Sequence, residues 1–332
     1  MGVSWLGGDD TTLRGARSLA DVLHSGGMSA PLYATGLSRP TACPLPWWLR
    51  LLSRLPLPIL YGIAAGATWT MRRIVRHRVQ TVRTNIERSF SALPVRERRR
   101  IEDGYYTNLS QVIAEVLKMG DLSRDELRQR VTFGNPQLVR DVVAAGGSVL
   151  VVCAHQCNWE WQLLALSAQL QVPVQAAYKP LRGSLGERLM RTLRSQFGAE
   201  LVPAKELLGS LLRRRDARVI AMVADQAPVS SDFKHWTGFL EQPTAFYLGP
   251  AKIAQATRFA VLFARMLRVS RGHYEVVFEP LAAAGERASA AEITERYARA
   301  VETQVRAAPA DWLWSHRRWK LSPPAQAAAL ER

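Results

Sequence analysis

The stretch SVLVVCAHQCNWEW, Ser148 to Trp161, decides the fold of this chain. Five strand-forming residues, Val149 to Cys153, lead into His155, and Glu160 follows in the same stretch. An uninterrupted apolar run of this length is typical of a strand that is buried on both faces of a sheet. Open α/β sheets carry their functional side chains just beyond the carboxyl ends of such strands. We therefore expect a functional site at His155.

Apolar runs and helical patterns alternate downstream of this stretch. We expect further strands at 172–178, 201–202, 219–224, 259–266 and 273–278, and helices at 137–145, 159–169, 185–197, 205–215, 246–256 and 290–307. Strands that alternate with helices predict an α/β fold with a mostly parallel or mixed sheet and helices on both faces. Residues 74–119 are expected to be helical and to precede the alternating part.

Composition and charge narrow the possible functions. The chain has 332 residues, 48% of them hydrophobic and 22% charged, which excludes a disordered protein and allows one large domain or two smaller ones. A net charge of +16 predicts an anionic partner, such as nucleic acid, anionic lipid or an acidic protein. Three cysteines suit a reducing compartment. His155, Cys153 and Cys157 have no fourth ligand at a metal-like spacing, so we expect neither metal nor cofactor.

The N-terminal part divides into two segments. Residues 1–43 are rich in Gly, Ser and Thr and are expected to form a disordered extension, and residues 323–332 a short tail. Pro44 to Met71 carries Trp47 and Trp48 and a charge-free apolar run, and an arginine cluster follows it. This order predicts a membrane-associated helical segment over residues 44–73, which either spans the bilayer or lies in its surface. The alternative is a buried helix with a basic cap.

His155 and Glu160 could form a catalytic pair. On an ideal helix, residues five apart differ by about 140° around the axis, so the histidine must lie on the turn and the glutamate in the first helical turn. From there the carboxylate would reach back to the imidazole, fix its tautomer and leave the other nitrogen free to accept a proton. The alternative is a surface histidine beside a glutamate that stabilises the helix N-terminus.

The motif AHQCNWEW, with its H-x4-E spacing, resembles the catalytic motif of the lipid A biosynthesis acyltransferases, the lauroyl and myristoyl transferases of the lysophospholipid acyltransferase superfamily. Other segments resemble the same family in the same order: NIERSF (85–90), AAYKPLRG (176–183), ADQAP (224–228), TAFYLGPAKIA (244–254) and PADWLWSHRRWK (309–320). The resemblance covers residues 44–321, so we expect an acyltransferase α/β domain over residues 74–322.

The resemblance implies transfer of a fatty acyl group from acyl carrier protein to a hydroxyl of a lipid acceptor. It implies His155 as general base paired to Glu160, at the cytoplasmic face of the inner membrane of a Gram-negative bacterium. The acceptor implied first is an anionic lipid, a lipid A precursor, and nucleic acid is not expected as a partner. The substrate-binding residues expected with it are Arg194, Asp225, Lys179, Asn158, His316 and Arg317.

The chain also departs from the family pattern. Cys157 stands where glycine is usual, Lys179 replaces the commoner arginine, and the segment after Asp225 differs from that of the best-known members. By implication that segment lines the acceptor or acyl region, so an aminolipid or a lysophospholipid stays open as the acceptor. A basic nucleic-acid-binding protein would leave the apolar segment unexplained and lacks a matching motif. The His155 and Glu160 motif argues against a non-catalytic membrane scaffold.

Overall fold

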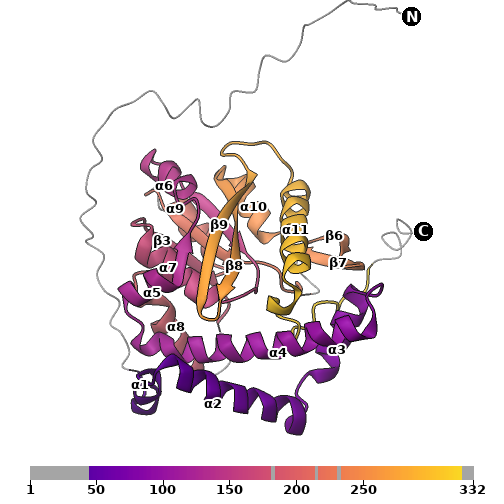
Figure 1. Ribbon diagram of the computed structural model, residues 1–332. Helices are drawn as coiled ribbons and strands as arrows, with labels where there is room; N and C mark the ends of the chain where they lie inside the picture. The colour runs from indigo at the N-terminus through magenta and orange to yellow at the C-terminus, as the bar shows by residue number, and fades with distance from the viewer. Residues whose placement is uncertain (1–44, 181–183, 214–215, 230–232, 324–332) are drawn as a thin grey trace, which may run out of the picture. The chain divides into compact units, whose positions relative to one another are not determined.

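The computed structural model describes residues 45–180, 184–213, 216–229 and 233–323 (Figure 1). The extension expected at 1–43 and nearly all of the tail expected at 323–332 lie outside the described residues. The helices are α1 (Trp47–Ser53), α2 (Leu57–Thr70), η1 (Met71–Val75), α3 (Val79–Ser89), α4 (Val95–Lys118), η2 (Met119–Asp121), α5 (Arg124–Arg130), α6 (Gln137–Ala144), α7 (Trp159–Gln169), α8 (Ser184–Ser195), α9 (Leu207–Arg213), α10 (Gly249–Thr257), α11 (Ala290–Ala307) and η3 (Pro309–Asp311).

Within the described residues, seven strands form one sheet in the order β1-β9-β8-β2-β5-β3-β4. Their bounds are β1 (Val131–Phe133), β2 (Val149–Cys153), β3 (Val174–Tyr178), β4 (Glu200–Pro203), β5 (Val219–Val223), β8 (Ala260–Ser270) and β9 (His273–Ala282). The strands β8, β2, β5, β3 and β4 run parallel to one another, whereas β9 is antiparallel to β8, and β1 is parallel to β9. The predicted α/β fold with a mostly parallel, mixed sheet is confirmed.

The central strand β2 is buried on both faces, as its apolar sequence predicts. Val149 and Val151 belong to one core cluster, together with side chains from α2, α5, α6 and α7. Leu150 and Val152 point the other way, into a second cluster with side chains from α3, α9, α10 and α11. Helices therefore cover both faces of the sheet, and Figure 1 shows α7 and α11 on opposite sides of β8 and β9.

A hairpin that the sequence pattern does not reveal precedes α10. Strands β6 (Lys234–Phe239) and β7 (Gln242–Tyr247) pair antiparallel around a two-residue turn, Leu240 and Glu241. Both turn residues have positive φ, 49° and 61°, whereas hairpin turns of this kind usually carry Asn or Gly. Because the usual turn residues are missing, the sequence did not predict the hairpin, and the helix expected at 246–256 was predicted to start too early. In the structure β7 ends at Tyr247 and α10 starts at Gly249.

The segment expected to anchor the protein in a membrane forms α1, α2 and η1. One face of α2 is buried in the first core cluster through Leu57, Leu60 and Ala64, and α2 lies along α4 (Figure 1). Its other face exposes large apolar side chains, including Ile59 and Ile63. Among the described residues no one helix has the length and apolar character to cross a bilayer, and α1 meets that criterion only jointly with residues 57–75, across a bend of 115°.

Candidate active site

The site begins where two neighbouring strands end together. Strands β2 and β5 are parallel, and their last residues, Cys153 and Val223, are partners in the register. His155 and Asp225 each follow two residues later, so the sheet brings them side by side. His155 Nδ1 lies 2.5 Å from Asp225 Oδ1, and the backbone N–H of His155 donates to Asp225 Oδ2 over 3.0 Å. The imidazole is thus held by a carboxylate at one ring nitrogen.

Asp225 is enclosed at the end of its strand. Its residue surface is 2% exposed, and the indole Nε1 of Trp312 donates to Oδ2 over 2.7 Å. Burial by itself would raise the pKa of Asp225, but the positive charge available on His155 and the hydrogen bonds from His155 and Trp312 outweigh it and hold that pKa below its ordinary value. Asp225 is therefore a carboxylate near neutral pH and can stabilise an imidazolium.

The second ring nitrogen of His155 faces a less enclosed environment. The Gln226 side-chain amide lies 3.2 Å from Nε2, and the ring of Trp159 lies edge-on to the imidazole with centroids 5.1 Å apart. If Nδ1 carries the proton donated to Asp225, Nε2 has a free lone pair, which the Gln226 amide can approach as a donor. The His155 side chain is 16% exposed, so a substrate hydroxyl could take the place of that amide.

The pairing expected between His155 and Glu160 is wrong. Glu160 lies in the first turn of α7, as predicted, but its carboxylate binds Arg194 of α8, with Arg194 Nε 2.7 Å from Oε2 and Nη2 2.5 Å from Oε1. Burial lowers the pKa of Arg194, yet the hydrogen bonds and charge of Glu160 outweigh this and raise it overall. Two hydrogen bonds to a permanent cation bind the Glu160 carboxylate more strongly than one hydrogen bond to a neutral imidazole would. Asp225 is the carboxylate that pairs with His155 instead.

Asn158 serves the fold around the site. Its Oδ1 accepts from the backbone N–H of Trp161 and so caps α7, while its Nδ2 donates to Glu115 over 2.7 Å. The residue is 0% exposed. The substrate-binding role predicted for Asn158 therefore has no accessible polar atom to support it. Glu115 also accepts from Tyr61 and Tyr274, so this buried carboxylate joins α2, α4, α7 and β9.

The backbone of the turn between His155 and α7 shows why glycine is usual at position 157. Cys157 has φ of +56°, a left-handed conformation that costs a residue with a side chain but not glycine. Its backbone N–H donates to Asp311 O, and its buried thiol donates to Met266 O over 3.4 Å. Burial and nearby Asp311 raise the thiol pKa well above its ordinary value, so it stays protonated.

The remaining residues that were predicted to bind substrate differ in how exposed they are. Lys179 directly follows β3, the neighbour of β5, and is exposed. His316 is half-buried and lies close to the dyad, because its Nε2 accepts from the backbone N–H of Ala227. Burial, followed by the charges of Arg318, His155 and Lys320, lowers the pKa of His316 to about 4, although Asp225 opposes this, so His316 is neutral near pH 7. Arg317 is exposed beside it.

The sequence analysis missed two contacts of the histidine–aspartate pair. In the sequence, Trp312 was considered only as part of the PADWLWSHRRWK segment, and Gln226 only as part of the ADQAP segment. A signal was available for Gln226, since it directly follows a strand-end aspartate. Trp312 gives no local signal, because its indole reaches Asp225 from a segment 87 residues further along the chain.

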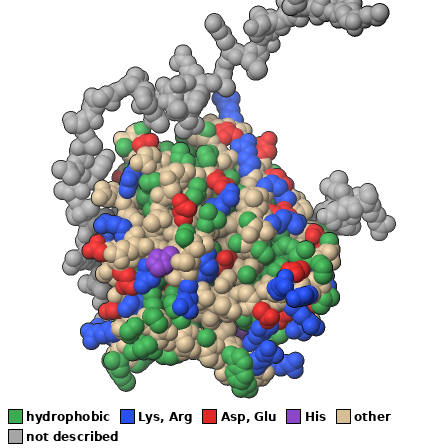
Figure 2. Space-filling model, in the orientation of Figure 1, with side chains coloured by type: hydrophobic (Ala, Val, Ile, Leu, Met, Phe, Trp, Pro, Cys, Tyr) green, Lys and Arg blue, Asp and Glu red, His purple; other side chains and the backbone are tan. Residues whose placement is uncertain are grey.

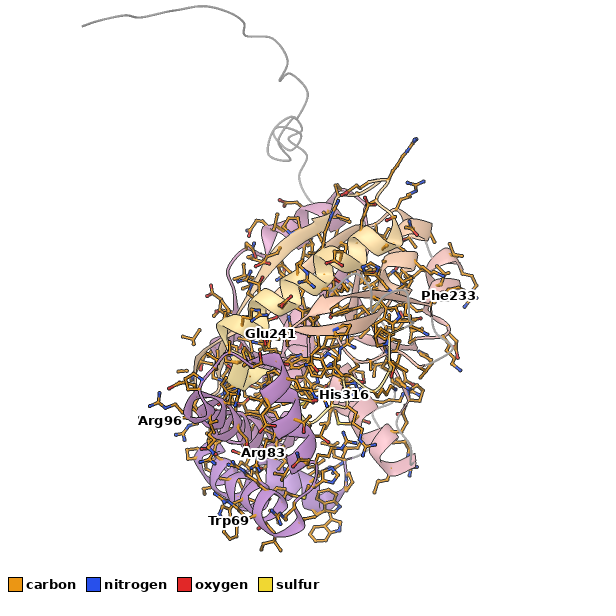
Figure 3. All side chains as sticks on the ribbon, turned by 90° about the vertical axis from the view of Figure 1, so that its right-hand side faces the viewer. Trp69, Arg83, Arg96, Phe233, Glu241 and His316 are labelled. Atoms are coloured by element: carbon orange, nitrogen blue, oxygen red, sulfur yellow. The ribbon has the colours of Figure 1, made fainter. Side chains whose placement is uncertain are left out.

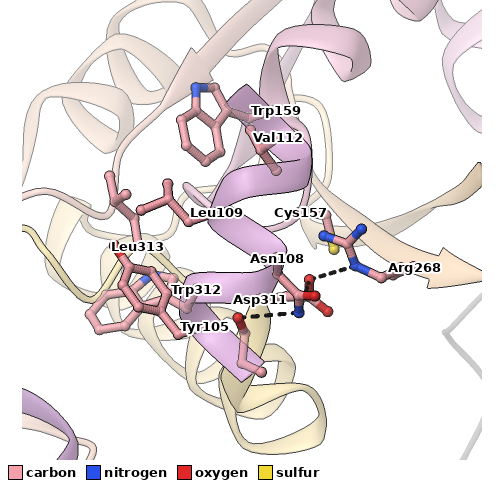
Figure 4. Close-up of a pocket in the computed structure, with 11 residues that line it drawn as sticks. Tyr105, Asn108, Leu109, Val112, Cys157, Trp159, Arg268, Asp311, Trp312 and Leu313 are labelled. Carbon is pink, nitrogen blue, oxygen red and sulfur yellow. Dashed lines mark hydrogen bonds and ion pairs between the residues drawn. The ribbon is translucent and has the colours of Figure 1, made fainter. Parts of the chain in front are cut away.

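A small pocket lies beside the turn between His155 and α7 (Figure 4). Its volume of about 10 Å³ is enough for about one water molecule, so it is too small for an acyl chain. Asp311 forms its polar side and is held by Arg268 over 2.7 Å and by Asn108 over 3.0 Å. Trp159 and Trp312 line it as well. The pocket therefore marks where the C-terminal segment is fastened to α4 behind the site.

The fold and the site together define an α/β protein with a histidine–carboxylate pair at adjacent strand ends, the arrangement that general-base catalysis uses. The sequence model of the bacterial lipid A biosynthesis acyltransferases matches residues 46–321, so the chain belongs to that family. It is also similar to the lipid A biosynthesis lauroyltransferase of Escherichia coli (strain K12), with 23% identity over 304 residues, 88% of this chain and 96% of the relative. The resemblance drawn from the motifs is confirmed, and family membership supports acyltransferase activity.

Proposed function

We propose that this protein transfers a fatty acyl group from acyl carrier protein to a hydroxyl of a lipid acceptor, and that the acceptor is a lipid A precursor. The observation that carries the proposal is the 2.5 Å contact between His155 Nδ1 and Asp225 Oδ1 at the ends of two adjacent parallel strands. Family membership supports the reaction class, and the name of the Escherichia coli relative supports a lipid A pathway.

In the proposed reaction, His155 is the general base. Its Nδ1 donates to Asp225, so Nε2 can take the proton of the acceptor hydroxyl while the hydroxyl oxygen attacks the thioester carbon. The new C–O bond gives a tetrahedral oxyanion, and Asp225 stabilises the imidazolium beside it. When the oxyanion collapses, the C–S bond breaks and the leaving sulfur takes the proton back from His155. The ester and the free thiol of the carrier are the products.

Glu160 has a different role in this proposal, as the residue that positions Arg194. The guanidinium uses Nε and Nη2 for Glu160, and among the residues that the structure describes Nη1 has no hydrogen-bond acceptor. The Arg194 side chain is 21% exposed, so Nη1 could donate to the tetrahedral oxyanion or to a phosphate of the acceptor. Loss of one such donor typically costs about 3 kcal/mol in the transition state. Lys179, His316 and Arg317 are proposed to help bind the acceptor.

We also propose that the reaction takes place at the cytoplasmic face of the inner membrane. The net charge of +16 would attract both an anionic bilayer and acidic acyl carrier protein. Exposed apolar side chains of α1 and α2, among them Trp47 and Trp69, would contact the acyl chains. Figure 2 shows hydrophobic side chains with Lys and Arg beside them along the lower edge, where Figure 1 has α1 and α2.

Mass spectrometry of lipid A and total lipid tests the proposal. Cells without the gene should lack one acyl group on lipid A, and the unchanged gene or His273→Ala should restore it, whereas His155→Ala should not. His273 is a matched control because it is exposed at the start of β9. A mass change in an aminolipid or a lysophospholipid, with lipid A unchanged, would reassign the acceptor. Restoration by His155→Ala would refute the proposed mechanism.

A further inference from the structure

A cleft of about 450 Å³ lies away from the strand-end site, between η1, α3 and α4. Five arginines line it: Arg72, Arg73, Arg83, Arg98 and Arg99. Its lining also contains three carboxylates, so it carries a net charge of +2. A concave surface with several guanidinium groups fits a phosphate group, because the planar fork of arginine matches two phosphate oxygens.

The arginines of the cleft differ in whether they form ion pairs with carboxylates of the protein. Arg72 pairs with Glu102 over 3.1 Å and with Asp103 over 2.7 Å, and Arg83 pairs with Glu102 over 3.3 Å. Among the residues the structure describes, Arg73 and Arg99 have no carboxylate within ion-pair distance. The paired arginines are thus fixed by the fold, whereas Arg73 and Arg99 can turn to an external anion.

The chain between η1 and α3 shapes the cleft. Arg76 and Arg78 both have φ of 54°, so η1 ends and α3 begins at left-handed residues, and Arg73 of η1 and Arg83 of α3 line the same cleft. Backbone of this kind is costly for residues other than glycine and persists only where its surroundings hold it. Arg78 is held by its bond to Ser315 O over 2.9 Å.

Large apolar side chains stand beside the cleft and are not covered. Trp69, three residues before Arg72, is 59% exposed, and Ile74, directly after Arg73, is 66% exposed. Met71 and Val75 are exposed with them. In Figure 3, Trp69 and Arg83 are both in the lower part of the molecule, below Phe233. An acidic protein or a nucleic acid offers no apolar phase for these side chains, whereas a bilayer offers acyl chains directly beneath its phosphates.

The cleft is connected to the candidate active site through α3. Asn85 of α3 donates to Trp314 O over 2.8 Å and to His316 O over 2.9 Å. The same C-terminal segment supplies Trp312, which binds Asp225. A lipid bound in the cleft would therefore contact α3, which is hydrogen-bonded to the C-terminal segment whose Trp312 contacts Asp225.

We propose that this cleft binds the phosphate of an anionic membrane lipid, with Arg73 and Arg99 as the main ligands, while Trp69 and Ile74 insert between the acyl chains. This inference rests on the membrane location in the proposed function and assigns it a specific site. The lipid in the cleft is a surface ligand that docks the protein, and it is distinct from the acyl acceptor at His155.

Vesicle sedimentation tests this site with the full chain. The probes are vesicles of phosphatidylcholine alone and of phosphatidylcholine with about one third phosphatidylglycerol, at low and at physiological salt. Arg73→Ala/Arg99→Ala should lower binding to the anionic vesicles about 30-fold and leave binding to the neutral vesicles unchanged, since each arginine near an anionic surface contributes about 1 kcal/mol, or about fivefold in affinity. Trp69→Ala should weaken binding to both.

The matched control is Arg213→Ala/Arg287→Ala, which removes two exposed arginines. Arg213 ends α9 and Arg287 lies between β9 and α11, both far from α2 in Figure 1. This control should bind the anionic vesicles like the unchanged protein. An equal loss in the control would mean that net charge alone drives binding, and the proposed cleft site would be refuted.

Two further measurements separate the alternatives. If Arg73→Ala/Arg99→Ala binds vesicles normally but raises the KM for acyl carrier protein, the cleft is a protein-docking site and the lipid assignment is wrong. If inorganic phosphate binds the cleft at micromolar concentration while vesicle binding is unaffected by the substitutions, the ligand is a free anion and the assignment is also wrong. His155→Ala should bind vesicles normally, so failure of the acyl-transfer proposal would be visible separately.

Discussion

Two acid–base pairs start from one short motif, yet they are built in different ways. His155 meets Asp225 because two parallel strands end side by side. The pair joins an imidazole to the carboxylate of Asp225, a residue that is 2% exposed. Glu160 meets Arg194 because α7 and α8 pack together, and the pair joins two full charges with the Arg194 side chain 21% exposed. The H-x4-E motif therefore contributes one residue to each of two pairs, and its own histidine and glutamate do not pair with each other.

The difference separates chemistry from positioning. Only the first pair contains an imidazole, a side chain that can exchange a proton, because an arginine does not release its proton near neutral pH. The second pair can fix a donor in space without titrating. Substitutions in the two pairs should therefore differ in size and in their effect on the pH profile.

The largest effect is expected at Asp225. Asp225→Asn should lower kcat by about 1,000-fold or more, because an amide in place of the carboxylate favours the wrong imidazole tautomer and leaves the imidazolium unstabilised. Steady-state acyl transfer from acyl carrier protein measures this, with thermal unfolding as the check that the variant folds. A variant that folds and keeps a tenth of the activity would remove Asp225 from the mechanism.

A smaller loss is expected in the second pair. Arg194→Lys should lower kcat/KM by about 10- to 100-fold, because lysine cannot reproduce the two-point contact with Glu160. Glu160→Gln should cause a similar loss, and the double variant should lose little more, because the two residues act as a unit. If Glu160→Gln instead matched Asp225→Asn and shifted the pH profile of kcat, Glu160 would act on the imidazole and the comparison would fail.

His316, which lies near the His155–Asp225 pair, should make the free energy of unfolding depend on pH. The pKa of His316 is about 4 in the folded protein against an ordinary 6.5, so the unfolded chain binds this proton first as the pH falls. The contribution of His316 to stability is complete above pH 6.5 and is lost progressively between 6.5 and about 4. Urea unfolding across this range should show a smaller loss for His316→Gln, and an identical pH dependence would contradict the assignment.

The smallest effect is expected on the turn between the pairs. Cys157→Gly and Cys157→Ala both remove the buried thiol, so the difference between them isolates the backbone at φ +56°. The glycine variant should be more stable than the alanine variant by about 1 kcal/mol, the usual cost of a left-handed residue with a side chain. Urea unfolding of the two variants measures it, and equal stabilities would show that the turn relaxes.

Local patterns predicted much of the framework correctly. Val149 to Cys153 is a strand and Trp159 to Gln169 a helix, at the bounds expected from the sequence, because a continuous apolar run and the helical pattern after it are signals within the chain segment itself. The hairpin of β6 and β7 was missed because Leu240 and Glu241 adopt positive φ without the usual turn residues. The N-terminal segment was harder to interpret, since α2 has one buried and one exposed apolar face.

By itself, the sequence determined the α/β class, the position of His155 on a turn after a strand, and the resemblance to an acyltransferase family that the family match confirms. Only the tertiary structure decided which carboxylate reaches the imidazole. Asp225 is 70 residues from His155 along the chain, and it arrives there because β2 and β5 pair in parallel register. Glu160 is close in sequence, but a two-point bond to Arg194 from a separate helix binds it more strongly than a neutral imidazole could.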